Sequence, residues 1–349
     1  MNLIRFILLP LAPIYGFIIR IRNLFFDKNI FKTVNVPAKI ISVGNLTIGG
    51  SGKTPMVIYL VELLKSINTR VGVLSRGYGR ASIGYLLVSD GDKLLSTVDQ
   101  SGDEIYHTAR ETKVPAAVCE RRVHGAKRFI KDTGVNTIVL DDAFQHRWIN
   151  RDIDLLIIEQ GFINSNDIFT HNYLPAGIMR EGLESVNRAD AIILNRKFYD
   201  KEDIIEKRKY LFKDKTIFHS YYKAIGFVDV AKNIEYSIEE FNGQKGFVIS
   251  GIANPDSFLK ALTLTGVEIN NQIIFRDHKE YSLKEVQQIR KKYYSTNSHS
   301  VITTEKDAVK LNKFSREFDD IDIFYLKIKL CLDDEKSFKQ YLINKLNDQ

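Results

Sequence analysis

One glycine-rich stretch constrains this chain more than any other: GNLTIGGSGKTP, residues 44–55. It follows the apolar, β-rich run KIISV at 39–43 and precedes PMVIYLVELLKSI at 55–67, whose apolar residues have helical spacing. Strand, loop and helix in this order are typical of the phosphate-binding loop GxxxxGK[ST]. Thr47 stands where the first glycine of that pattern belongs. The stretch therefore predicts a nucleotide site on a strand-to-helix turn, with a departure at its entrance.

The residue types in this loop match what phosphate binding needs. Glycines let backbone N–H groups approach phosphate oxygens that a side chain would block. We expect Lys53 to bridge the terminal phosphates of ATP and Thr54 to place its hydroxyl on Mg²⁺, while the helix N-terminus adds its dipole. An incidental glycine-rich turn is the alternative. The expected nucleotide-binding residues are Thr47, Ile48, Gly49, Gly50, Ser51, Gly52, Lys53 and Thr54.

A second motif supplies acidic residues of the kind that a magnesium nucleotide needs. In NTIVLDDAFQH, residues 136–146, an apolar run leads directly into Asp141 and Asp142. A carboxylate at the end of a neighbouring strand holds the metal ion of a phosphate loop, often through water. Carboxylates that cap a following helix are the alternative. We expect Thr54, Asp141 and Asp142 to form the metal site.

The rest of the chain predicts an α/β fold in two domains. Short apolar runs alternate with helix-like segments, which indicates a mostly parallel sheet covered by helices. A similar alternation begins again after about residue 225, and 349 residues are enough for two domains. We therefore expect a P-loop NTPase-like domain over residues 31–225 and a smaller α/β domain over residues 226–349.

The N-terminus predicts association with a membrane. The uncharged stretch from Phe6 to Ile19 is shorter than the roughly 20 residues that span a bilayer. Arg20 and Arg22 follow it and are suited to reach anionic headgroups. We expect residues 1–30 to form an interfacial or partly inserted helix; a helix that packs on the protein's own core is the alternative.

Charge and cysteine content indicate which partners and which metal ions the chain is suited to bind. The chain has 50 Lys+Arg against 43 Asp+Glu, a net charge of +7, which favours nucleic acid, anionic lipid or a phosphorylated substrate without choosing among them. Its two cysteines are far apart and lack metal-ligand spacing. The sequence therefore gives no indication of a zinc site.

Nine segments, in this order, resemble one family, the tetraacyldisaccharide 4′-kinases of lipid A biosynthesis. The segments are VGNLTIGGSGKTP (43–55), LSRGYGR (74–80), SGDE (101–104), ERRVHGA (120–126), LDDAFQHR (140–147), LPAGIMRE (174–181), SGIANPDSF (250–258), FRDHKEY (275–281) and TTEKDAVKL (303–311). They extend over nearly the whole chain, and Thr47 is usual in this family.

The resemblance implies ATP-dependent phosphorylation of the 4′-hydroxyl of an acylated glucosamine disaccharide 1-phosphate, forming lipid IVA. It implies a Gram-negative bacterium, a location at the cytoplasmic face of the inner membrane, and no nucleic-acid partner. It also implies two α/β domains that are joined by a two-stranded linker and close over ATP. The oligomeric state stays open.

The resemblance also assigns catalytic residues. Phosphoryl transfer needs positioning, charge neutralisation and a base for the attacking hydroxyl. The family places an aspartate and a histidine together, and they match Asp103 of SGDE and His278 of FRDHKE, with Lys53 as the third catalytic residue. Without the resemblance, Asp103 is equally a helix N-cap and His278 a surface residue. The spacing of TTEKDAVKL assigns it no role.

Charged and polar residues of the matching segments are candidate contacts for ATP or the lipid. A guanidinium binds phosphate through two hydrogen bonds, and Gln145 and His146 follow the acidic pair closely. Solvated surface charge is the alternative for each arginine. The candidates are Arg76, Arg80, Glu104, Arg121, Arg122, Gln145, His146, Arg180 and Glu181.

Two departures from the family pattern concern loops. LPAGIMREG stands in place of LPAGPLREP, so Ile178, Met179 and Gly182 replace Pro, Leu and Pro, and the loop is expected to be less rigid. Ala143 stands where the acidic motif usually has glycine, which is acceptable only with a negative φ.

Two other classes compete with the kinase. A membrane-attached P-loop NTPase switch or metallochaperone uses the same loop to change shape, and a metallochaperone needs a Cys or His cluster for its cargo, which the sequence lacks. A purely structural membrane-associated protein leaves Lys53, Thr54 and the two adjacent aspartates unexplained. We therefore favour the kinase.

Overall fold

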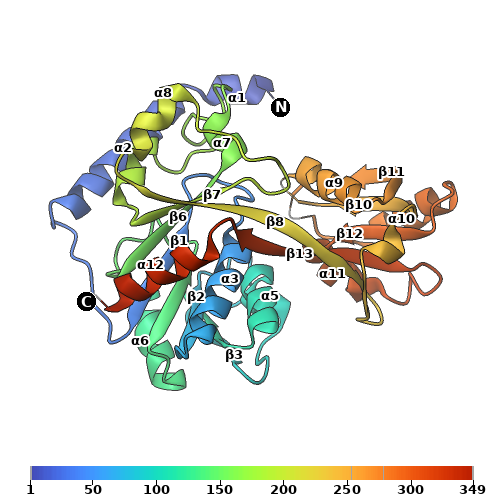
Figure 1. Ribbon diagram of the computed structural model, residues 1–349, viewed down its shortest axis with the longest axis horizontal. Coiled ribbons are helices and arrows are strands. Elements are labelled where there is room, and N and C mark those ends of the chain that lie inside the picture. Colours follow the sequence, from blue (N-terminus) through green and yellow to red (C-terminus); the bar gives the residue numbers. More distant parts are fainter. Residues whose placement is uncertain (1, 253, 278, 348–349) are drawn as a thin grey trace. The chain divides into compact units, whose positions relative to one another are not determined.

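The computed structural model describes residues 2–252, 254–277 and 279–347 (Figure 1). Its contacts divide the chain into two compact units. The first unit comprises Met1–Arg196, Asp200–Tyr221 and Cys331–Gln349, and the second comprises Lys197–Tyr199 and Tyr222–Leu330.

The first unit is built on a mostly parallel sheet, as the alternation of apolar runs predicted. The strand order is β8-β7-β6-β1-β5-β2-β4-β3, and only β3 is antiparallel to its neighbour. The bounds are β1 (Lys39–Gly44), β2 (Val71–Ser75), β3 (Leu86–Asp90), β4 (Pro115–Val118), β5 (Thr137–Asp141), β6 (Ile153–Glu159), β7 (Ala191–Asn195) and β8 (Thr216–Asp229). Strands β2, β5 and β7 are buried along their whole length, and apart from polar residues at their ends their sequences have no polar side chains.

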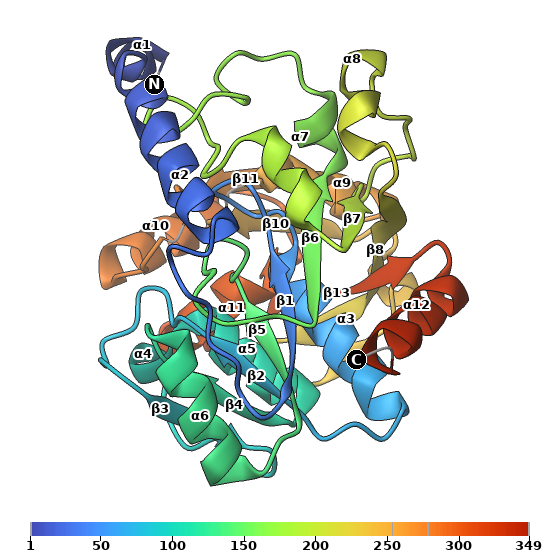
Figure 2. The same cartoon turned by 90° about the vertical axis from the view of Figure 1, so that its left-hand side faces the viewer.

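Helices and short 3₁₀ turns complete the first unit (Figure 2). Its helices are α1 (Asn2–Leu8), α2 (Leu11–Asp27), α3 (Lys53–Ser66), α4 (Val98–Ser101), α5 (Asp103–Thr112), α6 (Arg122–Thr133), α7 (Gln160–Asn164), α8 (Glu206–Lys209) and α12 (Glu335–Asn347). The 3₁₀ turns are η1 (Leu183–Arg188) and η2 (Tyr210–Phe212). Helix α3 contacts β1, β2 and β5, so it connects the glycine-rich loop to the centre of the sheet.

Residues 331–347 were predicted to belong to the smaller domain, and this prediction differs from the structure. They belong to the first unit, because Phe338 of α12 is fully buried there against the rings of Phe218 and Tyr59.

Helix α2 has two distinct faces. Ala12, Gly16 and Phe26 are buried on one face. The approach at Gly16 is close, because a Cβ there would lie 2.7 Å from the ring of Tyr173. The other face exposes large apolar side chains, namely Leu11, Ile14, Phe17, Ile18, Ile21 and Leu24. Among the described residues, none of the helices has both the length and the apolar character that crossing a bilayer requires.

The second unit is a smaller α/β structure. Its strands are arranged β11-β10-β12-β13-β8, with β9 paired to β8, and β10, β11, β12 and β13 run parallel. The bounds are β9 (Glu235–Tyr236), β10 (Lys245–Ser250), β11 (Glu268–Ile274), β12 (Ser300–Thr304) and β13 (Ile323–Leu332). Its helices and turns are η3 (Glu239–Phe241), α9 (Pro255–Leu264), α10 (Leu283–Tyr294), α11 (Glu305–Leu311) and η4 (Asn312–Phe314). Strands β8 and β13 contribute residues to both units.

Candidate nucleotide site

The glycine-rich loop and the acidic pair lie at the carboxyl ends of neighbouring strands of the first unit. Strands β1 and β5 pair in parallel with Val43 opposite Asp141, so the loop after β1 and the acidic pair start at the same edge of the sheet. Ser75, the last residue of β2, donates a hydrogen bond to Asp141 Oδ2 at 3.4 Å. Parallel α/β sheets bind ligands at this edge.

The loop has the backbone conformation that its glycines permit. Gly49 and Gly52 both have a φ of 99°, a region that residues with a side chain rarely adopt, and α3 begins directly afterwards at Lys53. A Cβ added at Gly50 would meet no described atom within 4 Å, so the space beside the loop is open. The amide of Ile48 donates to the carbonyl of Ile178 at 2.8 Å, which fixes the loop from outside.

Asn45 holds the two ends of the loop together, although no motif in the sequence predicted this role. Its side-chain amide donates to Ser51 Oγ at 2.8 Å and Thr47 Oγ1 at 3.4 Å. Its Oδ1 accepts from Lys53 Nζ at 3.3 Å and from Arg180 Nη2 at 2.7 Å. The only sequence signal is its position immediately after β1, because its partners become neighbours only when the loop folds back.

Asp142 carries most of the ion pairing of the acidic motif. Lys53 Nζ lies 3.6 Å from Asp142 Oδ1, and Arg180 Nη1 lies 3.0 Å from Oδ2. Burial raises the pKa of Asp142, but Lys53 and Arg180 outweigh it, so the pKa is lowered. Asp142 also takes the left-handed conformation, with a φ of 49°, which aspartate tolerates better than most residues. The positive φ belongs to Asp142 and not to Ala143, so alanine is acceptable at position 143 in place of the family's glycine.

Asp141 is almost fully buried, and nearby positive charges offset the cost of its burial less than they do at Asp142. Burial raises its pKa, the carboxylates of Glu104 and Asp142 raise it further, and Lys53 lowers it. Among the described residues, its Oδ1 has no hydrogen-bond partner. A buried carboxylate oxygen that lacks a donor, next to a second carboxylate, is the oxygen-rich setting that Mg²⁺ prefers. Asp141 and Asp142 therefore fit a divalent cation.

Arg180 joins the loop to the acidic motif. Besides Asp142 and Asn45, its Nε donates to the carbonyl of Thr47 at 3.0 Å, and its amide donates to the carbonyl of Leu46 at 2.7 Å. Gln145 lies in the same cluster, where it donates to the carbonyl of Asn45 at 2.8 Å. The structure thus brings Lys53, Asp142, Gln145 and Arg180 together.

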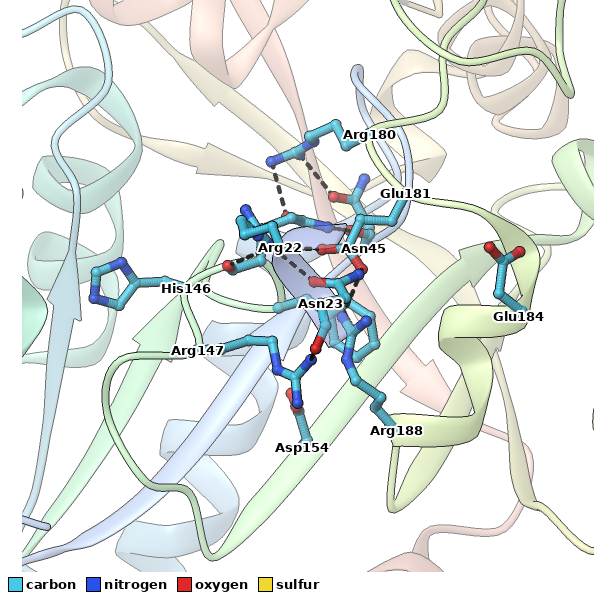
Figure 3. A network of polar contacts seen from close by, with 12 residues as sticks. Arg22, Asn23, Asn45, His146, Arg147, Asp154, Arg180, Glu181, Glu184 and Arg188 are labelled. Atoms are coloured by element: carbon cyan, nitrogen blue, oxygen red, sulfur yellow. Dashed lines mark hydrogen bonds and ion pairs between the residues drawn. The ribbon is translucent and has the colours of Figure 1, made fainter. Parts of the chain in front are cut away.

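Glu181, the next residue, points into a buried cluster that includes helix α2 (Figure 3). Its side chain is fully buried and paired with Arg22 at 3.0 Å and Arg188 at 2.6 Å. Arg22 also donates to the carbonyl of Gln145 at 3.1 Å, and Asn23 donates to Glu181 at 3.3 Å. The polar side of α2 is therefore connected to the loop that carries Arg180. A buried carboxylate left without these partners would be strongly destabilising.

Two further predicted residues lie near the acidic pair. Arg122 is buried and donates to the carbonyl of Cys119 at 3.0 Å; burial lowers its pKa to about 10, although Asp141 and Asp142 act in the opposite direction. Burial, aided by Arg122 and Arg151, lowers the pKa of His146 to about 4. His146 is therefore neutral near pH 7.

The remaining predicted residues have different surroundings. Arg80 is bound to Glu120 and to the carbonyl of Gly84 at 2.6 Å, whereas Arg76 and Arg121 are exposed. Asp103 and Glu104 form the first turn of α5, where the amide of Glu104 donates to Asp103 Oδ1 at 3.0 Å. His278 lies outside the described residues.

Comparison with known sequences identifies a family. The family described as tetraacyldisaccharide-1-P 4′-kinase matches residues 4–347. The chain is 32% identical to the tetraacyldisaccharide 4′-kinase of Desulfatibacillum aliphaticivorans, over 99% of this chain and 94% of that protein. It is 35% identical to the protein of the same name from Chlorobium phaeovibrioides, over 87% of this chain and 86% of that protein.

A solved structure agrees with this assignment. A crystal structure of LpxK from Aquifex aeolicus, described as an "apo" form in complex with ATP, is similar with a TM-score of 0.78 and 30% sequence identity. The match covers 98% of this chain and 99% of that one. From the matches over almost its whole length, this chain belongs to the tetraacyldisaccharide 4′-kinase family.

Proposed function

We propose that this kinase transfers the γ-phosphoryl group of ATP to the 4′-hydroxyl of a tetraacylated glucosamine disaccharide 1-phosphate, forming lipid IVA. The observation that carries the proposal is the cluster of Lys53, Asn45, Asp142 and Arg180 around an open glycine-rich loop. In a member of this family, such a cluster is suited to hold the triphosphate of the donor.

Each part of the cluster has a role in binding. The loop amides and Lys53 would hold the triphosphate. Arg180 connects the loop to the acidic motif, because it contacts both Thr47 and Asp142. Thr54, Asp141 and Asp142 would hold Mg²⁺, which neutralises negative charge on the phosphates when it is bound. Arg180 would then remain as a counter-charge to Asp142.

The residues that we assign to the acceptor side of the reaction are inferred from the resemblance to the family. We propose that Asp103 takes the proton of the 4′-hydroxyl and that His278 orients Asp103. Arg76 and Arg121 are exposed and suited to meet the anionic groups of the lipid. Arg80 and Glu181 already have ion-pair partners, so we assign them to support of the site rather than to substrate contact.

Mixing purified protein with Mg²⁺, γ-labelled ATP and the lipid disaccharide 1-phosphate tests the reaction. We expect label on the lipid, and no labelled lipid when a 4′-deoxy analogue replaces the acceptor. A switch or metallochaperone would instead hydrolyse ATP without an acceptor. Release of inorganic phosphate with an unlabelled disaccharide would therefore contradict the kinase function.

We also propose that α1 and α2 rest on the cytoplasmic face of the inner membrane. The exposed face of α2 is apolar, whereas Arg22 and Asn23 on its other side bind Glu181. A helix with one apolar face and a polar face fixed to the protein is suited to lie in the interface.

The membrane proposal predicts a loss of lipid binding when the exposed face is made acidic. The variant Ile14→Glu/Phe17→Glu/Ile18→Glu removes three side chains that are 57%, 64% and 58% exposed, and it keeps Arg22 and Asn23. Deleting residues 1–25 is a poorer test, because it would leave Glu181 without two of its partners.

Co-sedimentation with vesicles that contain phosphatidylglycerol measures the effect. We expect the triple variant to remain in the supernatant and the wild type to sediment. Ile83→Glu is the matched control, since Ile83 is 93% exposed elsewhere in the first unit. Equal sedimentation of the triple variant and the wild type would mean that α2 is not the membrane contact.

A further inference from the structure

Asn195, the last residue of β7, binds the glycine-rich loop from a distant part of the chain. Its side-chain Nδ2 donates a hydrogen bond to the carbonyl of Ser51 at 3.1 Å, across a sequence separation of 144 residues. Asn195 is fully buried, and burying an amide costs free energy that its hydrogen bonds must offset. The otherwise apolar strand AIILN therefore ends in a buried donor to the loop.

The sheet holds Asn195 in a fixed place. Its position is paired with Glu159 of β6 and with Ser220 of β8, both in parallel ladders. Strand β6 lies between β7 and β1, so Asn195 reaches the loop after β1 from two strands away. Because its backbone lies within the ladder and its side chain is buried, Asn195 is a rigid donor rather than a mobile surface group.

Ser51 is the part of the loop where a rigid donor has the most effect, because it stands between two glycines. Gly50 precedes it, and Gly52 follows it with a φ of 99°. Glycine loses more conformational freedom on folding than any other residue, so this part of the loop is costly to order. Asn45 holds the side chain of Ser51 at 2.8 Å, and Asn195 holds its main chain. The two asparagines together fix the one residue between the glycines.

The direction of the Ser51 carbonyl also sets the direction of the next amide. A peptide unit is planar and trans, so the carbonyl oxygen of Ser51 and the N–H of Gly52 point in opposite directions. With the oxygen bound to Asn195, the N–H of Gly52 is directed away from the Asn195 side chain. Gly52 immediately precedes α3, and amides at the start of a helix are suited to bind phosphate. The contact therefore orients one of the amides that would meet the triphosphate.

We propose that Asn195 is a positioning residue for the nucleotide, which holds the Ser51–Gly52 peptide in the orientation that binds the triphosphate. The inference rests on the proposed function, in which the loop amides and Lys53 hold ATP. Asn195 itself contacts neither ATP nor the lipid in this proposal. Its loss lets the peptide adopt other orientations in the free enzyme, so the binding-competent fraction falls and the apparent Kd for the nucleotide rises in proportion.

Asn195→Leu is the main test, because leucine has a similar size and no hydrogen-bond donor. We expect the Kd for the non-hydrolysable analogue AMP-PNP with Mg²⁺ to rise by roughly 5- to 50-fold, the effect of taking the donor from one buried acceptor. KM for ATP should rise with it, whereas kcat at saturating ATP should stay within about threefold, since the bound triphosphate then holds the loop. Isothermal titration calorimetry gives the Kd, and initial rates of lipid phosphorylation give KM and kcat.

A matched control and a second variant accompany this test. Ser220 is the fully buried neighbour of Asn195 in β8, and among the described residues its Oγ has no hydrogen-bond partner. Ser220→Ala therefore changes the same part of the sheet without a contact to the loop, and it should keep the Kd and kcat of the wild type. Asn195→Thr suits a strand, but its hydroxyl lies closer to the backbone than the asparagine amide. It should weaken AMP-PNP binding as Asn195→Leu does.

The titration separates a loss of affinity from a loss of fold, because unfolded protein lowers the binding stoichiometry and leaves the Kd of the folded fraction unchanged. An unchanged Kd in Asn195→Leu and Asn195→Thr would overturn the inference, whatever the stoichiometry. A loss of kcat at saturating ATP without a rise in KM, or an equal rise of Kd in Ser220→Ala, would also overturn it. A different result would refute the proposed function instead: Lys53→Ala with both the AMP-PNP affinity and the kcat of the wild type would mean that the loop is not the phosphate site.

Discussion

Replacing Lys53 by alanine is expected to lower kcat for lipid phosphorylation by roughly 10²- to 10³-fold, or about 3–4 kcal/mol of transition-state stabilisation. The ammonium lies between Asn45 and Asp142, at the first residue of α3, where loop and acidic motif meet. Its loss removes the positive charge that would meet charge developing on the transferred phosphoryl group. Steady-state kinetics with varied ATP measure the effect.

The fold should survive this substitution. Asp142 keeps Arg180 as an ion-pair partner at 3.0 Å, so the variant does not leave this carboxylate without a counter-charge. Lys65→Ala, at the other end of α3, removes an exposed lysine of the same helix and should retain full turnover. If Lys53→Ala kept most of the wild-type kcat, the loop would not be the phosphate site.

Features that are local in sequence were predictable. The order of strand, glycine-rich loop and helix is encoded within residues 39–67, and the change from apolar run to Asp141 lies within one strand. Parallel strands buried on both faces give continuous apolar runs, so the mostly parallel α/β architecture followed from the same patterns.

Partners that are distant in sequence were not predictable. Asn45 and Arg180 are 135 residues apart, and Arg22 and Glu181 are 159 apart. Sequence periodicity indicates which face of an element is apolar, but it does not indicate which charges meet when distant segments fold together. For this reason the sequence did not indicate the ion-pair partners that Arg80 and Glu181 have in the structure.

The C-terminal helix illustrates a related limit. Strand and helix patterns continue through residues 323–347 without a break in composition, so nothing in the sequence marks a return to the first unit. The change of unit occurs inside β13, between Leu330 and Cys331. The burial of Phe338 against Phe218 and Tyr59 shows where the last helix belongs.

Replacing Asp103 by asparagine is expected to lower kcat by roughly 10²- to 10⁴-fold with little change in KM for ATP, because general-base catalysis contributes about this much. Asp103 begins α5, where a negative charge is favoured by the helix dipole, and asparagine keeps an oxygen that can accept from the amide of Glu104. The substitution therefore removes the basic carboxylate and leaves the local fold. Initial rates of lipid phosphorylation at saturating ATP measure the loss.

A double mutant shows whether Asp103 and His278 act as one unit. If His278 acts by orienting Asp103, then Asp103→Asn/His278→Ala should be hardly slower than Asp103→Asn alone, since the second change removes a contribution already lost. Independent effects would multiply and would contradict the pairing. Glu111→Gln, at an exposed carboxylate of the same helix, is the matched control and should keep full turnover. Asp103→Asn with near wild-type kcat would exclude Asp103 as the base, because an amide cannot accept the proton of the attacking hydroxyl.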